Sequence, residues 1–297
     1  MLSGPAKAFW RCEMLTRIIS GTIGAAILVL VLFLPSYALA LTVLAASAIG
    51  LYEFRRALKN RDINIDLTIS IIFSLIISAK AYAPALPAQF FSGLPVFLRR
   101  VLRPGDLDAL LIVLVIYLFC RVIFDKSRFK PEDLAWTLAG ILYIPFLLSF
   151  TVKTRIMDMG FEFIWLIMIG SIITDTFAYF VGVSVGRTKI IPHISPKKTV
   201  EGSIGGAAGC MLFMILYGAF VINKASTGVI SLYHFAAMGL LCGVVSQLGD
   251  WAASAIKRFA GIKDYGTLIP GHGGIMDRAD SILFVAPVVY IYVNLFI

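Results

Sequence analysis

The sequence predicts an all-α polytopic integral membrane protein with about nine transmembrane helices. Of its 297 residues, 59% are hydrophobic and only 14% are charged, and the mean hydropathy is +0.90. These values lie outside the range of soluble globular chains. The apolar residues fall in separate runs, each close to the roughly 20 residues that a spanning helix needs. The cations are distributed unevenly among the intervals between the runs.

Taken in order, the apolar runs give the expected spans. The interval 85–107 between the third and fourth runs contains Phe90, Phe91 and Phe97 beside Arg99 and Arg100. That mixture is typical of an amphipathic segment at the membrane interface rather than of a span. We expect an N-terminal transmembrane region at 1–133 and a C-terminal region at 134–297 that carries the candidate catalytic residues. The expected spans are 18–34, 36–52, 67–84, 109–124, 134–152, 161–183, 204–222, 231–248 and 281–297.

The positions of the cations orient the chain. With a cytoplasmic N-terminus, most of the 26 Lys and Arg residues fall in cytoplasmic intervals. The C-terminus is then outside, and the polar stretch 249–281 lies on the cytoplasmic face. We therefore expect a protein of the inner (plasma) membrane with a polar active-site cavity that faces the cytoplasm. The net charge of +9 suits anionic lipid headgroups and gives no support for a nucleic-acid partner.

Three polar groupings lie on that cytoplasmic side. The first is Asp175, between two threonines late in an apolar run. A carboxylate inside a membrane helix is costly unless it faces a cavity or a partner, so Asp175 is a candidate functional residue. The alternative is a helix–helix hydrogen bond that only fixes packing.

The second grouping is the loop 187–201, which contains Lys197 and Lys198 and ends at Glu201. The two ammonium groups and the backbone amides at the start of the next helix would form a cradle for an anion. The alternative is a positive-inside loop followed by small residues. The glycines that follow Glu201 fit this alternative, because their spacing allows close helix packing.

The third grouping is the stretch 249–281 itself. Asp277 and Asp280 are three residues apart at the start of the last apolar run, so their carboxylates are expected to point the same way. Asp250 would complete a site from the facing helix. Hard oxygen ligands of this kind favour Mg²⁺ or Mn²⁺ over zinc. The glycines of 270–274 would let the backbone approach a ligand closely. Capping by the helix dipole, the alternative, accounts for only one aspartate.

These motifs resemble one enzyme family. The segments Ser254–Arg258, Lys263–Gly266 and Pro270–Asp280, in this order and spacing, closely resemble the signature of phosphatidate cytidylyltransferases, also called CDP-diacylglycerol synthases. The segments Asp175–Tyr179 and Ser195–Gly202 resemble a second block of that family. The resemblance is close from Asp175 onward and elsewhere rests on hydrophobic character. Ala279 and Val200 depart from the family pattern, and neither position carries a charge.

The resemblance implies transfer of CMP from CTP to phosphatidic acid, which yields CDP-diacylglycerol and pyrophosphate for phospholipid biosynthesis, with Mg²⁺ required. The second pKa of a phosphate monoester is ~6, so phosphatidate is already mostly dianionic at neutral pH and needs no dedicated general base. The remaining tasks are positioning and charge neutralisation.

Roles for individual residues follow from the motifs and the resemblance together. The metal ligands are Asp250, Asp277 and Asp280, with a second cation left open. The other catalytic residues are Lys257, Arg258, Lys263, Asp264 and Arg278. The substrate-binding residues are Lys197, Lys198, Ser254, His272, Asp175 and Glu201. For a lone loop histidine such as His272, a structural hydrogen bond is the alternative.

Other functions stay open at this point. The intramembrane Asp175 also suits a cation-coupled membrane transporter, which would move ions without nucleotide. A lipid kinase that uses CTP would transfer phosphate rather than CMP. A CDP-alcohol phosphotransferase shares the lipid, metal and aspartates, but its characteristic pattern is not found in this sequence. Exposed small-residue faces would suit a homodimer.

Overall fold

The computed structural model describes residues 4–102, 107–125, 128–226 and 228–297, with side chains described from Ile19 onward. In this part of the chain every regular element is helical. The α-helices are α1 (Gly4–Phe33), α2 (Ser36–Leu58), α3 (Leu67–Tyr82), α4 (Ala88–Ser92), α5 (Val96–Val101), α6 (Leu107–Phe124), α7 (Pro131–Ile141), α8 (Leu147–Arg155), α9 (Gly160–Met168), α10 (Thr174–Val185), α11 (Val200–Tyr217), α12 (Asn223–Ala225), α13 (Leu232–Phe259) and α14 (Met276–Phe296).

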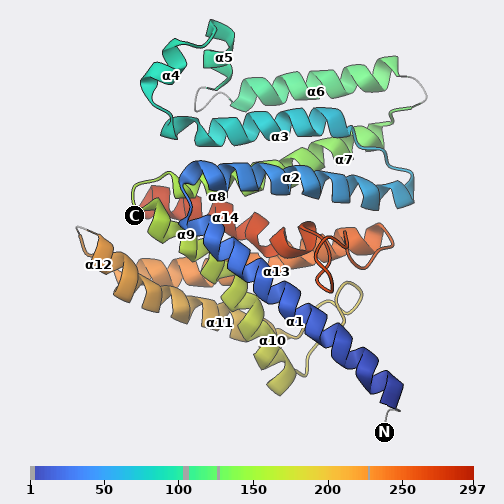
Figure 1. Ribbon diagram of the computed structural model, residues 1–297, viewed down its shortest axis with the longest axis vertical. Helices are drawn as coiled ribbons and strands as arrows, with labels where there is room; N and C mark the ends of the chain where they lie inside the picture. Colours follow the sequence, from blue (N-terminus) through green and yellow to red (C-terminus); the bar gives the residue numbers. More distant parts are fainter. Residues whose placement is uncertain (1–3, 103–106, 126–127, 227) are drawn as a thin grey trace.

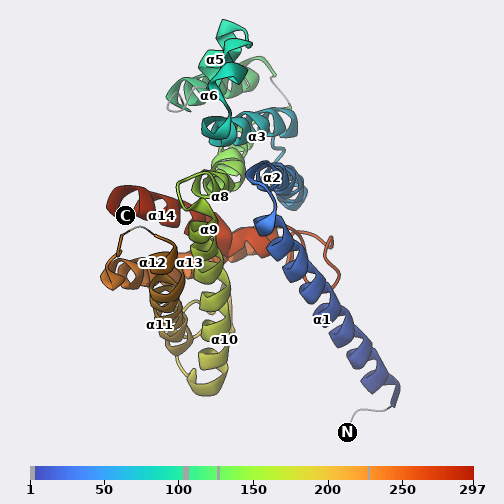
Figure 2. The same ribbon diagram turned by 60° about the vertical axis from the view of Figure 1, so that its left-hand side comes forward.

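A helix covers each predicted apolar run. Among the described residues, eight helices are long and apolar enough to cross a membrane, and the first run appears as the shorter apolar helix Ile19–Phe33 within α1. The prediction of an all-α polytopic membrane protein is therefore confirmed. Figure 1 shows the helices stacked from α6 and α3, through α2 and α14, to α10 and α11. Figure 2 shows α1 extending away from this stack.

The interval 85–107 forms short elements rather than a span. It follows the 3₁₀ turn Ala83–Ala85 and contains the helices α4 and α5, which are far shorter than a membrane crossing. Phe97 and Arg99 on α5 are both exposed, as expected for an amphipathic segment. Arg103, which the sequence places in the same segment, lies outside the described residues.

Three spans contain a π-helical turn, at η3 (Leu142–Phe146), η4 (Ile169–Ile173) and η5 (Gly218–Ile222). The turn in η3 accommodates Pro145, which has no N–H group for the helical ladder. Each extra residue turns the following helix by about 100°. Because η4 directly precedes α10, its π turn sets the direction in which Asp175 faces.

Glycines allow α10, α11 and α13 to lie against one another. A Cβ on Gly202 of α11 would lie 2.7 Å from the carbonyl oxygen of Ala178 on α10, and a Cβ on Gly243 of α13 would lie 2.6 Å from Cα of Ala207 on α11. Both distances are shorter than any side chain tolerates. The close helix packing expected from the glycines after Glu201 is therefore confirmed.

The buried apolar residues form two clusters. The larger cluster joins α2, through residues such as Leu51 and Phe54, to the helices that follow residue 140. The smaller cluster includes Phe73, Leu118 and Ile141, and it holds α3, α6 and α7 together. Helix α2 therefore packs with the C-terminal helices that carry the polar motifs.

Candidate active site

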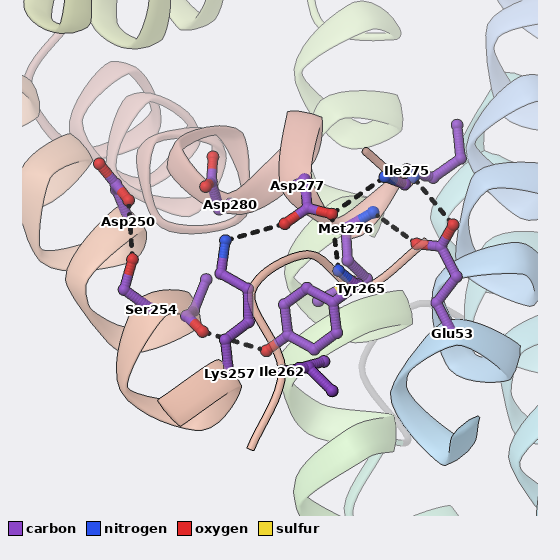
Figure 3. Close-up of polar contacts among 12 residues, drawn as sticks. Glu53, Asp250, Ser254, Lys257, Ile262, Tyr265, Ile275, Met276, Asp277 and Asp280 are labelled. Carbon is purple, nitrogen blue, oxygen red and sulfur yellow. Dashed lines mark hydrogen bonds and ion pairs between the residues drawn. The ribbon is translucent and has the colours of Figure 1, made fainter. Parts of the chain in front are cut away.

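The junction of α13 and α14 positions most of the predicted acidic residues. At Gly249 a Cβ would lie 2.5 Å from the carbonyl oxygen of Asp280, so the two helices touch at this point only because Gly249 has no side chain. The contact places Asp250 of α13 next to Asp280 of α14 (Figure 3). Lys257, two turns after Asp250 on α13, faces Asp277, one turn before Asp280 on α14.

The carboxylate of Asp277 is buried and accepts three hydrogen bonds. Its Oδ1 accepts from Nζ of Lys257 at 2.8 Å, and its Oδ2 accepts from the backbone N–H groups of Tyr265 at 2.8 Å and Gly274 at 2.9 Å. The positive end of the α14 dipole also favours a carboxylate here. Asp277 thus fixes Lys257 and both ends of the loop that joins α13 to α14.

Tyr265 forms the inner wall of that loop. Its side chain is 1% exposed, its hydroxyl donates to the carbonyl oxygen of Ala253 at 3.2 Å, and its ring lies 5.6 Å from the ammonium group of Lys257. Burial raises the pKa of the Tyr265 phenol, so the hydroxyl stays a neutral donor at physiological pH. The ring and Asp277 together hold Lys257 in one orientation.

Glu53 of α2 completes the support of the loop, and our sequence reasoning missed it. Its side chain is buried, and its two oxygens accept from the backbone N–H groups of Ile275 at 3.1 Å and Met276 at 2.9 Å, at the start of α14 (Figure 3). The signal was available, because Glu53 follows an apolar run directly and α2 continues through it to Leu58. The criterion applied to Asp175 would have selected it.

The glycines of the loop have a different role from the one predicted. A Cβ on Gly266 or Gly274 would overlap the carboxylate of Glu53, and a Cβ on Gly273 would lie 2.7 Å from Oδ2 of Asp277. Gly273 also has a φ of +87°, which side-chain-bearing residues rarely adopt. These glycines admit two carboxylates of the protein itself, whereas the sequence had suggested room for a ligand.

The end of α2 holds the same loop at three further points. Each is a hydrogen bond from a side chain of the segment 56–61 to a backbone carbonyl. The donors and acceptors are Arg56 to Tyr265 at 3.0 Å, Asn60 to Ala260 at 3.3 Å, and Arg61 to Phe259 at 2.5 Å. Together with Glu53, they fasten the loop to an element about 200 residues earlier in the chain.

The second wall of the site comes from α10 and the loop before α11. Lys198 forms an ion pair with Oδ2 of Asp250, whose Oδ1 accepts from the hydroxyl of Ser254 at 3.3 Å. Asp175 accepts from the hydroxyl of Ser281 on α14 at 3.2 Å. The structure therefore brings the first and second polar groupings of the sequence to the third.

The site carries more carboxylates than paired cations. Lys198 and Lys257 neutralise Asp250 and Asp277, whereas Asp175 and Asp280 have no ion-pair partner within the described part of the chain. Asp280 is partly buried and lies within electrostatic range of Asp250 and Asp175. Carboxylates without a counter-ion are unfavourable on membrane helices, so this arrangement favours an additional cation.

The described residues include no group of three or more His, Cys, Asp and Glu side chains arranged to hold a metal ion. Of the three predicted ligands, Asp277 is the most fully engaged, because its buried carboxylate accepts three hydrogen bonds from the protein. Asp250 and Asp280 are only partly buried and lie next to each other. Mg²⁺ is usually held by one or two carboxylates together with substrate phosphates, so the chemistry of this pair fits a Mg²⁺ ion.

Comparison with known proteins agrees with this geometry. The sequence matches a model described as "Cytidylyltransferase family" over residues 15–296. The chain belongs to the cytidylyltransferase family. The predicted resemblance is thereby confirmed at the level of the family.

Three curated members of the family illustrate the similarity. The phosphatidate cytidylyltransferase of Thermotoga maritima is 40% identical over 56% of this chain and 61% of its own length. That of Synechocystis sp. is 31% identical over 94% of this chain and 96% of its own length. That of Bacillus subtilis is 29% identical over 96% and 99%. Two of these cytidylyltransferases therefore align over nearly their whole length, including the region of α2.

Several predicted residues of this cytidylyltransferase hold loops together. Arg258 is exposed and donates to the carbonyl oxygens of Ile194 at 3.2 Å and Ile262 at 3.4 Å. Glu201 accepts from the backbone N–H groups of Arg187 and Thr188, both at 3.1 Å, and closes the base of its loop. Both side chains are therefore engaged by backbone groups of the loops.

His272 packs against α1. Its Nδ1 lies 2.9 Å from the hydroxyl of Ser20, and a Cβ on Gly21 would lie 3.0 Å from its ring. This is the structural alternative that the sequence offered for a lone loop histidine. Four other predicted residues are exposed, and no hydrogen bond or ion pair of their side chains is found in the described part of the chain. They are Lys197, Lys263, Asp264 and Arg278.

Proposed function

We propose that the protein is a phosphatidate cytidylyltransferase that transfers CMP from CTP to phosphatidic acid. The observation that carries the proposal is the site at the start of α14, where Lys198 pairs with Asp250, Lys257 pairs with Asp277, and Asp280 lies next to Asp250. The names of the relatives that align over nearly the whole chain support the same reaction.

The reaction needs positioning and charge neutralisation. A phosphate oxygen of phosphatidate attacks the α-phosphorus of CTP, a new P–O bond forms, and the bond to the β-phosphate breaks with release of pyrophosphate. Because phosphatidate is already dianionic, the protein supplies no general base. Lys198 and Lys257 are held in place by aspartates before substrate arrives, so little ordering of these side chains is needed on binding.

We assign a Mg²⁺ ion to Asp250 and Asp280, with phosphate oxygens of CTP as its remaining ligands. When bound, the ion would neutralise charge on the nucleotide and on the departing pyrophosphate. The neighbouring Asp175 has no ion-pair partner among the described residues, so a second cation near it is left open. To Asp277, the third predicted ligand, we assign the positioning of Lys257 and the loop, which its three hydrogen bonds support.

The protein is an integral membrane protein, and we further propose that the site faces the cytoplasm at the inner membrane. The excess of cations in the predicted cytoplasmic intervals supports this orientation. The orientation can be tested with two variants, each with a single cysteine, at the exposed position Lys263 or Val229. When intact cells are treated with a thiol reagent that does not cross the membrane, only the cysteine at 229 should react. A homodimer stays a prediction, which chemical cross-linking in the membrane would test.

The decisive experiment uses purified protein in detergent with phosphatidate and CTP labelled in either the α-phosphate or the γ-phosphate. A cytidylyltransferase puts the α label into lipid and the γ label into pyrophosphate, and both should require Mg²⁺. Transfer of the γ label to lipid would indicate a lipid kinase. Ion flux in liposomes without nucleotide, and no labelled lipid, would indicate a transporter.

A further inference from the structure

An apolar groove with a volume of about 360 Å³ lies between α11 and α13, which run side by side (Figure 1). One wall is formed by Leu240, Val244 and Leu248, which recur every four residues along one face of α13. The facing wall comes from α11, where Ala207 and Ala208 are small and leave the groove open. Most of the lining is apolar and half of its residues are exposed, as expected for a surface in contact with lipid chains.

The groove begins at the proposed active site. On α13, Gln247 lines the groove one helical turn before Asp250 and on the same face. On α11, Ser203 lines it one turn after the loop that carries Lys198. Gln247 donates to the carbonyl oxygen of Ser203 at 3.1 Å and accepts from the Ser203 hydroxyl, so this polar end joins both walls. Both walls therefore lead away from the Lys198–Asp250 ion pair.

The groove has the depth of one leaflet. Its lining on α13 extends from Trp251 to Leu240, which is ~16 Å at a rise of 1.5 Å per residue. Half of a hydrocarbon core of ~30 Å is ~15 Å. An acyl chain that starts at the level of the ion pair could thus lie along the groove to about the middle of the bilayer.

We propose that this groove holds one acyl chain of the lipid substrate while the lipid phosphate lies at Lys198. The inference rests on the proposed function. A second copy of the protein would also cover an apolar face, but it would not explain why both walls start one turn from the ion pair. An acyl chain gains no hydrophobic free energy on leaving the bilayer for the groove, so the groove acts through packing and positioning.

The test is to fill the groove and compare two lipid substrates. In Ala208→Leu the larger side chain occupies the groove, since Ala208 is exposed within its lining. For palmitoyl phosphatidate we expect kcat/KM to fall about five-fold, equivalent to ~1 kcal/mol. For hexanoyl phosphatidate, whose chains are too short to follow the groove, we expect the wild-type value. Ala45→Leu, the same change at an exposed position of α2, should leave both values unchanged.

Normal turnover of the hexanoyl substrate also shows that the variant is folded. Val244→Phe, which fills the groove from the opposite wall, should change the ratio of the two kcat/KM values in the same direction. A ratio equal to that of the wild type in both variants would overturn the acyl-chain assignment while leaving the proposed reaction intact. If the wild-type protein converted neither substrate, the proposed function would fail, and the acyl-chain assignment with it.

Discussion

Replacing Glu53 by glutamine should loosen the loop between α13 and α14 without altering any residue assigned to substrate. The carboxylate accepts from two backbone N–H groups, those of Ile275 and Met276. Glutamine is nearly the same size but has one acceptor oxygen, and its NH₂ group would face the second N–H. One hydrogen bond to a charged group, worth about 1.5–3 kcal/mol, is lost, and a buried donor is left unpaired at a cost of about 1–3 kcal/mol.

The local stability of the loop should therefore fall by about 3 kcal/mol, which corresponds to a roughly hundredfold increase in the open population. Hydrogen exchange measured by mass spectrometry reports this quantity directly, as faster exchange of peptides that cover 265–277. CMP transfer should fall at least ten-fold, since Lys257 is positioned by the same loop. Glu132→Gln, at an exposed acid on α7, is the matched control.

The reasoning would be refuted by wild-type exchange rates in the loop of Glu53→Gln. Faster exchange together with wild-type kcat would be a different failure. It would show that Glu53 supports the loop but that the loop does not position Lys257 for catalysis.

Three further predictions follow from the site. Lys198→Ala should lower kcat/KM about ten-fold, because it removes a phosphate-binding cation worth ~1.4 kcal/mol and leaves Asp250 without its ion-pair partner. Steady-state kinetics would measure the change. Unchanged kinetics would mean that Lys198 only helps to orient the chain in the membrane. Gly274→Ala should destabilise the protein by about 2–4 kcal/mol through overlap with Glu53, seen as a lower thermal midpoint, whereas Gly24→Ala, with open space around it, should not. Asp277→Asn should abolish CMP transfer and also lower the midpoint of thermal unfolding, since the variant loses the ion pair with Lys257 and a backbone hydrogen bond. Loss of activity at an unchanged thermal midpoint would argue against the structural role of Asp277.

The sequence predicted the fold well because membrane insertion depends on local hydropathy. Each apolar run became a helix, since a backbone in hydrocarbon must satisfy its own hydrogen bonds. The sequence also selected the acids that meet at the site, Asp175, Asp250, Asp277 and Asp280. Polar side chains are rare in such a chain, so their positions carry most of the functional information.

What the sequence could not predict depends on contacts between distant segments. Asp277 and Asp280 share a spacing that suggests one role, yet Asp277 is engaged by Lys257 and the loop while Asp280 is not. The role of Glu53 depends on α2 packing against α14, across 222 residues of sequence. The direction of Asp175 depends on the π turn in η4, for which the local sequence Ile169–Ile173 gives no proline signal.

The fastening of the loop to α2 means that the motif-bearing region is not a self-sufficient folding unit. A fragment beginning near residue 134 would contain every signature residue, but Gly266 and Gly274 would surround a space that only Glu53 fills. Such a fragment should recover activity when α1 and α2 are supplied as a separate polypeptide. Helices α3 and α6 of the smaller cluster lie between these two parts in sequence and contribute none of the contacts described for the site. An insertion or deletion between α3 and α6 should therefore preserve the chemistry.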